Sequence, residues 1–562
     1  MTEVPSDPAP QPFKVKKVNL QKADEVALLK QIQALNLTEN QRKKLMSAYN
    51  RFLEIKNYYD YQAEKRRLNQ IVRIPWNVYT QDINDISKAK ETLDASHTGM
   101  DKIKNRIYDY MTLKSAQPNE VPPTLCICGP NGIGKASIAK SIANAIGRKF
   151  AKVPILESTQ SAKGKSSWNG SIVDALIQAG SSNPVIYLQD INYLATSTNA
   201  MCDAVDPEKR GHFVDSFIRI PIDLSQVFFI CSWRTSYYYS VSFRLCPKLE
   251  IIVPHPEGYT NHQKLMIAKK HLLPKNFAKY QFTEGSVRFE EAALETILDE
   301  HTCEYGLVQL CAKIDQVCRK AAVKKIQAKE KTKEVLIDVE FVKEVLGSGN
   351  SCYPLVQFRK ERYLPLGVFF VLYVCGSSGS VWPLEMVIMP KRTHKMLTVT
   401  GQVSSVIEEA CNIASTYLYS NAEKYKIDRA KWNDSEVHIH NPRGATRKCG
   451  PSGGSATVLT MYSLFSGRHI RSDSVVTGEL TLSGQITAIG GINSKTTAAQ
   501  KHGFRRIVLP KENEIYVKEQ MDMKLKSEME IVFVSNVDEL FEAMLEKDVT
   551  PSSQNEMPKS KL

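Results

Sequence analysis

The sequence predicts a multidomain protein that combines an α/β core, a helical region and a separate α+β domain. A chain of 562 residues is too long for a single hydrophobic core, so three or four domains are expected. Apolar strands alternate with helical segments between residues 116 and 255, which indicates a parallel sheet. From residue 348 onward the pattern changes to strands, turns and a few helices, which is typical of an α+β domain.

Composition places the domain boundaries along the chain. Charged, helix-periodic sequence near the start predicts helices that pack on another domain. The expected order is a disordered tail over 1–20, helices over 21–115, the α/β core over 116–255, a mostly helical region over 256–347, the α+β domain over 348–548 and a second tail over 549–562. The longest apolar run, LPLGVFFVLYVC, is too short to span a bilayer, and the GSSGS after it predicts a β-hairpin. We therefore expect no membrane span.

The net charge of +14 and the 12 cysteines exclude little on their own. Basic residues are interleaved with acidic ones, as in RKAAVKKIQAKEKTKEV, which indicates a solvated helix face and argues against a primary nucleic-acid role. No C-x-x-C occurs in the chain, so we interpret the cysteines as reduced thiols of an intracellular protein and expect no metal site.

The stretch GPNGIGKAS resembles a phosphate-binding loop, G-x-x-x-x-G-K-[ST]. It comprises Gly129, Pro130, Asn131, Gly132, Ile133, Gly134, Lys135, Ala136 and Ser137. The strand TLCIC precedes it and the helix IAKSIANAIGRKF follows, which is the context such a loop requires; a tight strand-to-helix turn without a ligand is the alternative. Backbone amides and Lys135 can still bind the phosphates of ATP or ADP, whereas Ala136 lacks the hydroxyl that holds Mg²⁺.

A second buried strand, PVIYLQD, ends where an acidic pair should hold the metal and activate water. The chain offers Gln189 and Asp190 there, so one acid is missing or the register is shifted.

The last part of the chain contains GPSGG, which matches G-x-S-x-G, the nucleophile elbow of α/β-hydrolases. The strand EVHIH, however, ends about ten residues before Ser452 instead of directly before it. Ser452 is expected at a helix N-terminus, where backbone amides help to hold an oxyanion. Two activating groups are open: His438 or His440, as a base or as a metal pair on one strand face, and Lys495, which would form a Ser–Lys pair.

The chain resembles the Lon protease family, the AAA+ serine peptidases, through long ordered stretches that cover about residues 25–545. They include HIHNPRGATRKCGPSGG, VVTGELTLSGQITAIGGINSKTTAAQKHG, GPNGIGKASIAKSIANAIGRKF and IPWNVYTQDINDISKAKETLDASHTGMDKIKNRI. The resemblance implies an AAA+ core with an all-α lid and a Lon-type protease domain. It also implies that Ser452 is the nucleophile and Lys495 the general base, at the family's spacing of 43 positions, with Thr477 and Glu479 helping to place the lysine. The family degrades unfolded or damaged proteins as a hexameric ring.

Departures from the family are numerous in the ATPase half. The metal hydroxyl is Ala136, the sensor asparagine falls at Arg234, the trans-acting arginine at Lys248 and the second-sensor arginine at Val308. Trp168 is the only aromatic near the shortened pore loop, and the family's large N-terminal substrate-recognition domain has no counterpart. Beside the nucleophile, Cys449 replaces an aspartate and Arg443 a glutamate. These changes predict weak or absent ATP hydrolysis with an intact Ser–Lys dyad.

The chain ends in Ser560, Lys561 and Leu562, a receptor-read peroxisomal address, which predicts the peroxisomal matrix and a peroxisomal import receptor as partner. The function expected from all these features is a peroxisomal Lon-like serine endopeptidase whose AAA+ module binds nucleotide but hydrolyses it weakly or not at all. The alternative is a non-degrading, chaperone-like or regulatory subunit of a complete Lon.

Overall fold

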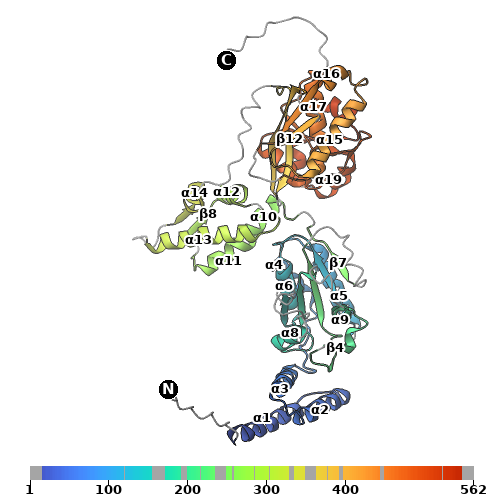
Figure 1. The fold of residues 1–562 in the computed structure, drawn as a ribbon. Helices are drawn as coiled ribbons and strands as arrows, with labels where there is room; N and C mark the ends of the chain where they lie inside the picture. Colours follow the sequence, from blue (N-terminus) through green and yellow to red (C-terminus); the bar gives the residue numbers. More distant parts are fainter. Residues whose placement is uncertain are drawn as a thin grey trace, which may run out of the picture. The chain divides into compact units, whose positions relative to one another are not determined.

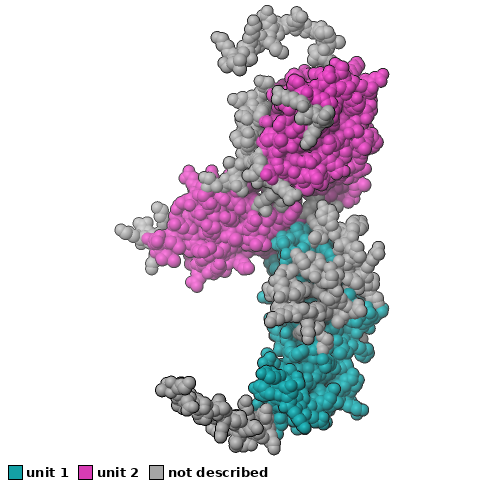
Figure 2. Space-filling view, viewed as in Figure 1, with its two compact units in different colours: residues 1–256 teal, residues 257–562 magenta. Residues whose placement is uncertain are grey.

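The computed structural model describes residues 15–118, 120–154, 171–191, 199–215, 217–234, 249–255, 258–283, 285–302, 304–327, 334–347, 362–375, 378–391, 396–442, 448–521 and 523–546. Figure 1 shows the fold, and Figure 2 shows the two compact units into which the chain divides, residues 1–256 and 257–562. No helix in the described ranges is both long and apolar enough to cross a membrane.

The first unit contains N-terminal helices followed by an α/β core. In chain order, its described elements are α1 (Val15–Gln33), α2 (Glu39–Leu53), α3 (Tyr58–Arg73), α4 (Ile86–Ser96), α5 (Asp101–Ala116), β1 (Leu125–Cys128), α6 (Lys135–Ile146), β2 (Phe150–Pro154), α8 (Ser171–Ala179), β3 (Val185–Gln189), α9 (Asn199–Val205), β4 (Phe213–Val214), β5 (Pro221–Ile222), β6 (Phe228–Trp233) and β7 (Glu250–Ile252).

Helix α1 begins inside the segment 1–20 that the sequence predicted to be a tail, and this part of the prediction is wrong. The sequence VKKVNL at its start contains neither glycine nor proline, so nothing stops the helix from extending backward from the periodic segment. The N-terminal helices are tied to the core through Arg67 of α3, which donates to the Ile218 carbonyl from Nε at 3.2 Å and from Nη2 at 2.8 Å.

The core of the first unit is a five-stranded sheet in the order β2-β3-β6-β1-β7, and every pairing in it is parallel. This confirms the predicted parallel sheet, and the three predicted strands are β1, β3 and β6. Strands β2 and β7 lie at the two edges and were not predicted from the sequence. Edge strands are buried less completely, and β7 has only three residues, so neither forms a continuous apolar run.

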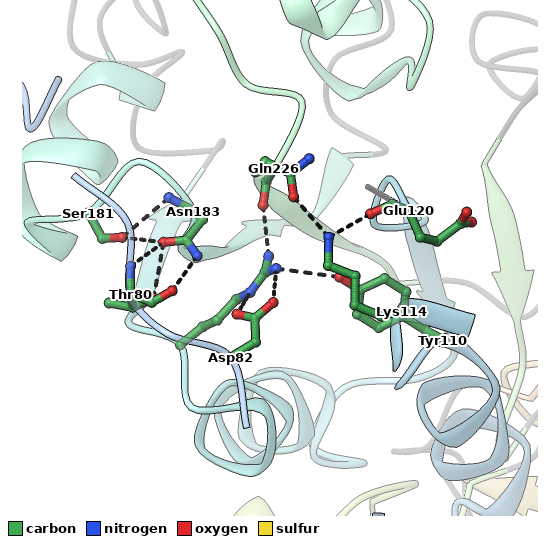
Figure 3. Close-up of polar contacts among 9 residues, drawn as sticks. Thr80, Asp82, Tyr110, Lys114, Glu120, Ser181, Asn183 and Gln226 are labelled. Carbon is green, nitrogen blue, oxygen red and sulfur yellow. Dashed lines mark hydrogen bonds and ion pairs between the residues drawn. The ribbon is translucent and has the colours of Figure 1, made fainter. Parts of the chain in front are cut away.

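A polar clamp closes the amino-terminal edge of this sheet (Figure 3). Arg148, just before β2, donates to both carboxylate oxygens of Asp82 at 2.7 and 2.6 Å and to the Gln226 carbonyl at 2.7 Å. Asn183, just before β3, exchanges two hydrogen bonds of 2.8 Å with the backbone of Thr80. This clamp holds the segment before α4 against the sheet. The phosphate loop follows the opposite end of β1, so the clamp lies away from that loop.

The second unit contains a mostly helical part followed by a mixed α+β part. In chain order, its described elements are α10 (Asn261–Ile267), the π-helical turn η4 (Ala268–Leu272), α11 (Leu273–Lys279), β8 (Val287–Phe289), α12 (Glu291–His301), α13 (Val308–Gln327), β9 (Val335–Ile337), α14 (Val339–Leu346), β10 (Val368–Cys375), β11 (Ser378–Pro390), β12 (Leu397–Thr400), α15 (Ser405–Ser420), α16 (Arg429–Asn433), β13 (Ser435–His440), α17 (Gly454–Ser466), β14 (Ser474–Val476), β15 (Glu479–Leu480), β16 (Ile486–Thr487), α18 (Ile492–Lys501), β17 (Arg506–Pro510), α19 (Glu514–Gln520), α20 (Met523–Glu528), β18 (Glu530–Val534) and α21 (Val537–Met544).

The sequence predicted an all-α lid, but in the structure β8 and β9 form a parallel pair within this helical part. Each of these strands has three residues, which is too short to display a period of two in the sequence. The apolar faces of α12, α13 and α14 bury residues such as Leu294, Ile314 and Val342 in a core of their own.

The α+β part is built on a seven-stranded mixed sheet in the order β12-β13-β11-β10-β14-β17-β18. The predicted hairpin is confirmed as β10 and β11, which pair antiparallel from Val368 with Glu385 to Cys375 with Ser378. Helix α17 is buried along most of its length and lies beside α15 (Figure 1). This central helix begins two residues after Ser452, so the core of the domain fixes the position of that serine.

Candidate active site and nucleotide site

Ser452 lies in a short 3₁₀ turn, Pro451–Gly453, that leads into α17. Its side chain is partly exposed, although the helix behind it is buried. The predicted context is therefore present: the strand β13 ends at His440, well before the serine, and a helix follows the serine at once. The amide of Gly454 donates to the Pro451 carbonyl. Ser452 nevertheless lies next to the N-terminus of α17, where the positive end of the helix dipole favours an oxyanion.

Lys495 reaches Ser452 from helix α18. Its Nζ lies 2.9 Å from Ser452 Oγ and 3.1 Å from Thr477 Oγ1, and the residue is only 3% exposed. Thr477 Oγ1 in turn donates to the Ser452 carbonyl at 3.2 Å. Three residues that the sequence singled out thus lie in contact, although they come from the turn before α17, the loop after β14 and helix α18. Glu479, the fourth, is exposed in β15, two positions beyond Thr477.

Close backbone contacts hold these elements together. The Gly478 amide donates to the Ser452 carbonyl at 3.0 Å, and the Ser455 amide donates to the Gly478 carbonyl at 3.1 Å. A Cβ at Gly478 would lie 2.4 Å from Ile486 Cγ2, and one at Gly454 would lie 3.0 Å from the Leu480 backbone nitrogen. Only glycines permit the segment that carries Thr477 to lie this close to the start of α17.

Gly379 of β11 has a comparable role beneath α18, and sequence reasoning missed it. A Cβ there would lie 1.9 Å from the Ser494 carbonyl oxygen and 2.9 Å from Ala498 Cβ. The helix that carries Lys495 therefore lies directly on the β10–β11 hairpin at a glycine. The GSSGS of the hairpin signals a turn, but it does not reveal that a helix packs on its second glycine.

The two histidines considered as activating groups both lie on β13 and share one face, as predicted. Thr400 Oγ1 lies 3.0 Å from His438 Nε2 and 2.7 Å from His440 Nδ1, so both rings bind a hydroxyl of the neighbouring strand. Within the described ranges, no group of three or more His, Cys, Asp or Glu side chains is arranged to hold a metal ion.

Cys449, which stands in place of an aspartate near the nucleophile, is exposed. Its neighbour Lys448 is 2% exposed, donates from Nζ to the Gly401 carbonyl at 2.5 Å, and lies 5.2 Å from the centre of the Trp382 ring. Lys448 thus anchors the start of the segment that leads to Ser452. Arg443 lies outside the described residues.

The predicted phosphate loop joins β1 to α6 in the first unit. Gly129, Gly132 and Gly134 have φ angles of 149°, 81° and 92°, in the region that favours glycine. Lys135 begins α6 and is 8% exposed, and its Nζ donates to the carbonyls of Gly129 and Pro130 at 2.7 and 2.8 Å. Burial lowers the pKa of Lys135 to about 8. Ala136 and Ser137 are the next two residues of the helix.

Gln189 ends β3 and Asp190 follows it in a left-handed conformation with φ 60°. Asp190 is 4% exposed, and its Oδ2 accepts hydrogen bonds from Arg234 Nη2 at 2.7 Å and from Gln189 Nε2 at 3.1 Å. The single acid at this strand end is therefore paired with an arginine, and sequence reasoning, which named Arg234 as a lost sensor, did not predict the pair.

These residues do not fit the Mg²⁺ that AAA+ nucleotide sites use. Ala136 offers no oxygen, Gln189 replaces one carboxylate, and the remaining carboxylate of Asp190 is bound by Arg234. Mg²⁺ prefers oxygen ligands in near-octahedral geometry, usually including a carboxylate.

Three further residues near the loop were also missed by sequence reasoning. A Cβ at Gly134 would lie 3.5 Å from Met100 Cε and 3.8 Å from His97 Cδ2, and one at Gly129 would lie 3.5 Å from the His255 carbonyl. Nothing in the spacing of His97, Met100 and His255 signals that they meet the loop. Of the other predicted positions, Val308 begins α13 and is 63% exposed. Trp168, Lys248, Ser560, Lys561 and Leu562 lie outside the described residues.

Three family models match consecutive parts of the chain. They are the AAA ATPase family associated with various cellular activities, over residues 125–235, the Lon protease AAA+ ATPase lid domain, over 278–335, and the Lon protease (S16) C-terminal proteolytic domain, over 337–547.

Relatives that match most of this chain are also named as Lon proteases. The Lon protease of Aquifex aeolicus is 33% identical over 86% of this chain and 61% of its own length. The Lon protease of Desulfovibrio desulfuricans is 33% identical over 79% of this chain and 51% of its own length. A Caenorhabditis briggsae protein named "Lon protease homolog 2, peroxisomal" is 32% identical over 93% of this chain and 69% of its own length. The chain thus spans less than two thirds of the first two relatives.

Proposed function

Because the chain belongs to the Lon protease family, we propose that it is a serine endopeptidase that degrades unfolded or damaged proteins with a Ser452–Lys495 dyad. The observation that carries this proposal is the 2.9 Å contact between Lys495 Nζ and Ser452 Oγ at the start of a buried helix. A lysine acts as a base only when it is neutral, and burial away from water disfavours a charged amine.

In the proposed mechanism, the neutral Lys495 amine accepts the proton of Ser452 as Oγ attacks the carbonyl carbon of the substrate. The positive end of the α17 helix dipole stabilises the oxyanion that develops. Lys495 then gives the proton to the leaving amine, and the C–N bond breaks to leave an ester on Ser452. Water, deprotonated by Lys495, attacks the ester and restores the serine. Thr477 keeps the lysine in reach of Ser452 through its 3.1 Å contact with Nζ.

For the AAA+ module we propose ATP or ADP binding with weak or no hydrolysis. The loop glycines and Lys135 support binding. Ala136, Gln189 and the Arg234–Asp190 pair remove a metal ligand, an acid and the sensor asparagine together, and such parts contribute orders of magnitude each to phosphoryl transfer.

We further propose a homo-oligomeric, hexameric ring in the peroxisomal matrix, reached through an import receptor that reads Ser560, Lys561 and Leu562. The family membership supports the ring. The printed name of the Caenorhabditis briggsae relative and the terminal S-K-L of this chain support the location.

The decisive experiment measures cleavage of an unstructured protein, with and without ATP, by the wild type and by Ser452→Ala. The wild type should cleave the substrate, and Ser452→Ala should lower the rate by about 1,000-fold or more because the nucleophile is removed. Equal rates for the two proteins would exclude the endopeptidase. ATP is expected to change the wild-type rate little, and it should be consumed slowly or not at all.

A second candidate, a non-degrading chaperone-like or regulatory subunit of a complete Lon, is favoured by the exposed Cys449 in place of an aspartate beside the nucleophile. Co-purification with an active homologue, together with no cleavage by the isolated chain, would support it. Cleavage by a ring made only of this chain would exclude it.

A further inference from the structure

The carboxyl edge of the first unit's sheet carries a protein cation beside the phosphate loop. Arg234 directly follows β6, which pairs with β1 in a register that places Trp233 opposite Cys128, the last residue before the loop. The first loop amide, that of Gly129, donates to the Trp233 carbonyl at 3.1 Å. Arg234 is therefore one residue away from the hydrogen bond that ties the phosphate loop to the sheet.

The guanidinium of Arg234 also binds the carboxylate of Asp190, which a metal ion at this site would need as a ligand. The Arg234 side chain is 33% exposed, whereas that of Asp190 is 5% exposed, so the carboxylate is the more buried partner of the pair. A divalent cation could bind Asp190 only by displacing Arg234, which would leave two cationic groups competing for one buried carboxylate. Gln189 adds a further competitor for this carboxylate, because its amide nitrogen, not its oxygen, faces Asp190.

The net charge of the site stays the same when Arg234 and one carboxylate replace Mg²⁺ and two carboxylates. A site with two carboxylates, Mg²⁺ and the loop lysine carries a net charge of about +1, since the metal cancels the two acids. Here Arg234 cancels Asp190, and Lys135 again leaves a net charge of about +1. Lys135 interacts electrostatically with both Asp190 and Arg234, so the three charges together set the electrostatic potential at the phosphate loop.

A guanidinium is suited to the phosphate that the metal would otherwise bind. It is always charged in proteins, and its planar array of N–H donors matches phosphate oxygens. Arg234 follows β6 at the sheet edge where the phosphate loop follows β1, and its side chain is 33% exposed. One arginine can therefore neutralise Asp190 and contact a polyphosphate at the same time.

We propose that Arg234, held in place by Asp190, substitutes for Mg²⁺, so that this chain binds ATP or ADP as the metal-free anion. The proposal rests on the nucleotide binding proposed above and specifies its ligand. It separates binding from hydrolysis, because a guanidinium supplies charge but cannot hold and activate a water molecule as a metal does.

The test is isothermal titration calorimetry of the full chain with ATP, once with excess Mg²⁺ and once with EDTA. We expect equal affinities within error. If Mg²⁺ tightens ATP binding by about tenfold or more, the proposal is overturned while nucleotide binding stands. If ATP binds under neither condition, nucleotide binding itself fails and the proposal fails with it.

Variants test the role of the arginine directly. Arg234→Asn should weaken ATP binding in EDTA by about tenfold or more, because a charge-assisted contact to phosphate is lost. The matched control, Arg66→Asn on the exposed face of α3, removes the same charge elsewhere and should bind like the wild type. Wild-type affinity of Arg234→Asn in EDTA would overturn the proposal.

A reconstructed metal site gives a second, independent readout. The triple variant Ala136→Thr, Gln189→Asp and Arg234→Asn restores the hydroxyl and the acidic pair and removes the guanidinium. We expect its ATP affinity to become about tenfold or more higher with Mg²⁺ than with EDTA, with circular dichroism confirming the fold. A folded triple variant that binds ATP equally in Mg²⁺ and EDTA would contradict the proposal that these three residues make ATP binding independent of Mg²⁺.

Discussion

Two buried lysines, one in each compact unit, follow glycine-containing turns at the start of a helix, yet their hydrogen-bond partners differ. Lys135 binds the carbonyl oxygens of Gly129 and Pro130, whereas Lys495 lies against the hydroxyl groups of Ser452 and Thr477. A carbonyl only accepts hydrogen bonds, so Lys135 must donate to both of its partners. A hydroxyl both donates and accepts, so Lys495 can exchange a proton with Ser452. The same residue type thus serves as a hydrogen-bond donor to the phosphate loop in one unit and, as we propose, as a base in the other.

The largest expected effect comes from removing the amine of Lys495. Lys495→Met keeps an unbranched apolar side chain but removes the base, so the rate of cleavage of an unstructured peptide should fall by about 1,000-fold or more. Initial rates measured alongside thermal unfolding separate a loss of chemistry from a loss of fold. Lys431→Met, an exposed position on α16, is the matched control and should retain the wild-type rate. A folded Lys495→Met variant with substantial activity would remove the contrast between the two lysines.

The next largest effect should come from the glycine beneath α18. Gly379→Ala places a methyl group where the Ser494 carbonyl now lies, so α18 must shift and carry Lys495 away from Ser452. A displacement of about 1 Å in a catalytic group costs roughly 100-fold in rate, and we expect kcat to fall by about that factor. Gly211→Ala serves as the control, because its new Cβ would meet nothing closer than 3.9 Å. Equal kcat values for the two variants would show that α18 tolerates the shift.

Removing the second hydroxyl partner of Lys495 should have a smaller effect. Thr477→Val keeps the shape of the side chain but loses the contacts to Lys495 and to the Ser452 carbonyl. A hydrogen bond to a charged or reacting group is worth about 2 kcal/mol, which corresponds to a loss of about 30-fold in kcat/KM. Thr477→Ser retains the hydroxyl and should recover most of the rate. A role limited to packing would instead make Thr477→Ser the poorer enzyme, because serine lacks the methyl group.

The smallest predicted effect concerns Lys135 and pH. Since burial lowers its pKa to about 8, the free protein loses this charge above that pH, and ATP should bind about tenfold more weakly at ~pH 9 than at ~pH 7. Stability should change in the opposite direction. The unfolded chain, with a lysine pKa of about 10.4, binds more protons between ~pH 8 and ~pH 10, so this group's contribution to the free energy of unfolding rises there.

Calorimetric titrations with ATP at several pH values check the first effect, and Lys135→Met is the reference for both effects. This variant should bind ATP more weakly at every pH and should lose the pH dependence. An ATP affinity that does not change between ~pH 7 and ~pH 9 in the wild type would show that Lys135 keeps its proton through this range.

Sequence reasoning found the phosphate loop and the strands β1, β3 and β6 because a long apolar run or a fixed spacing marks each of them. It also named Ser452, Lys495 and Thr477, which the structure brings together, and their roles stay predictions. The edge strands, the β8–β9 pair and the start of α1 were missed because short elements leave no periodic pattern. Gly379 and the Arg234–Asp190 pair were missed for another reason. Each is a contact between segments far apart in the chain, and the pattern of a single segment does not encode it.

The clamp between Asp82 and Arg148 changes where the α/β domain must start if it is to fold by itself. The Arg148 side chain is 1% exposed, so a shortened chain that begins at the predicted boundary of residue 116 would bury a guanidinium without its carboxylate. Breaking such a pair costs about 3–5 kcal/mol, which is a large share of a domain's stability. The smallest autonomous version of this domain therefore has to include Thr80 and Asp82, and the linker before α4 is part of the folding unit instead of a spacer.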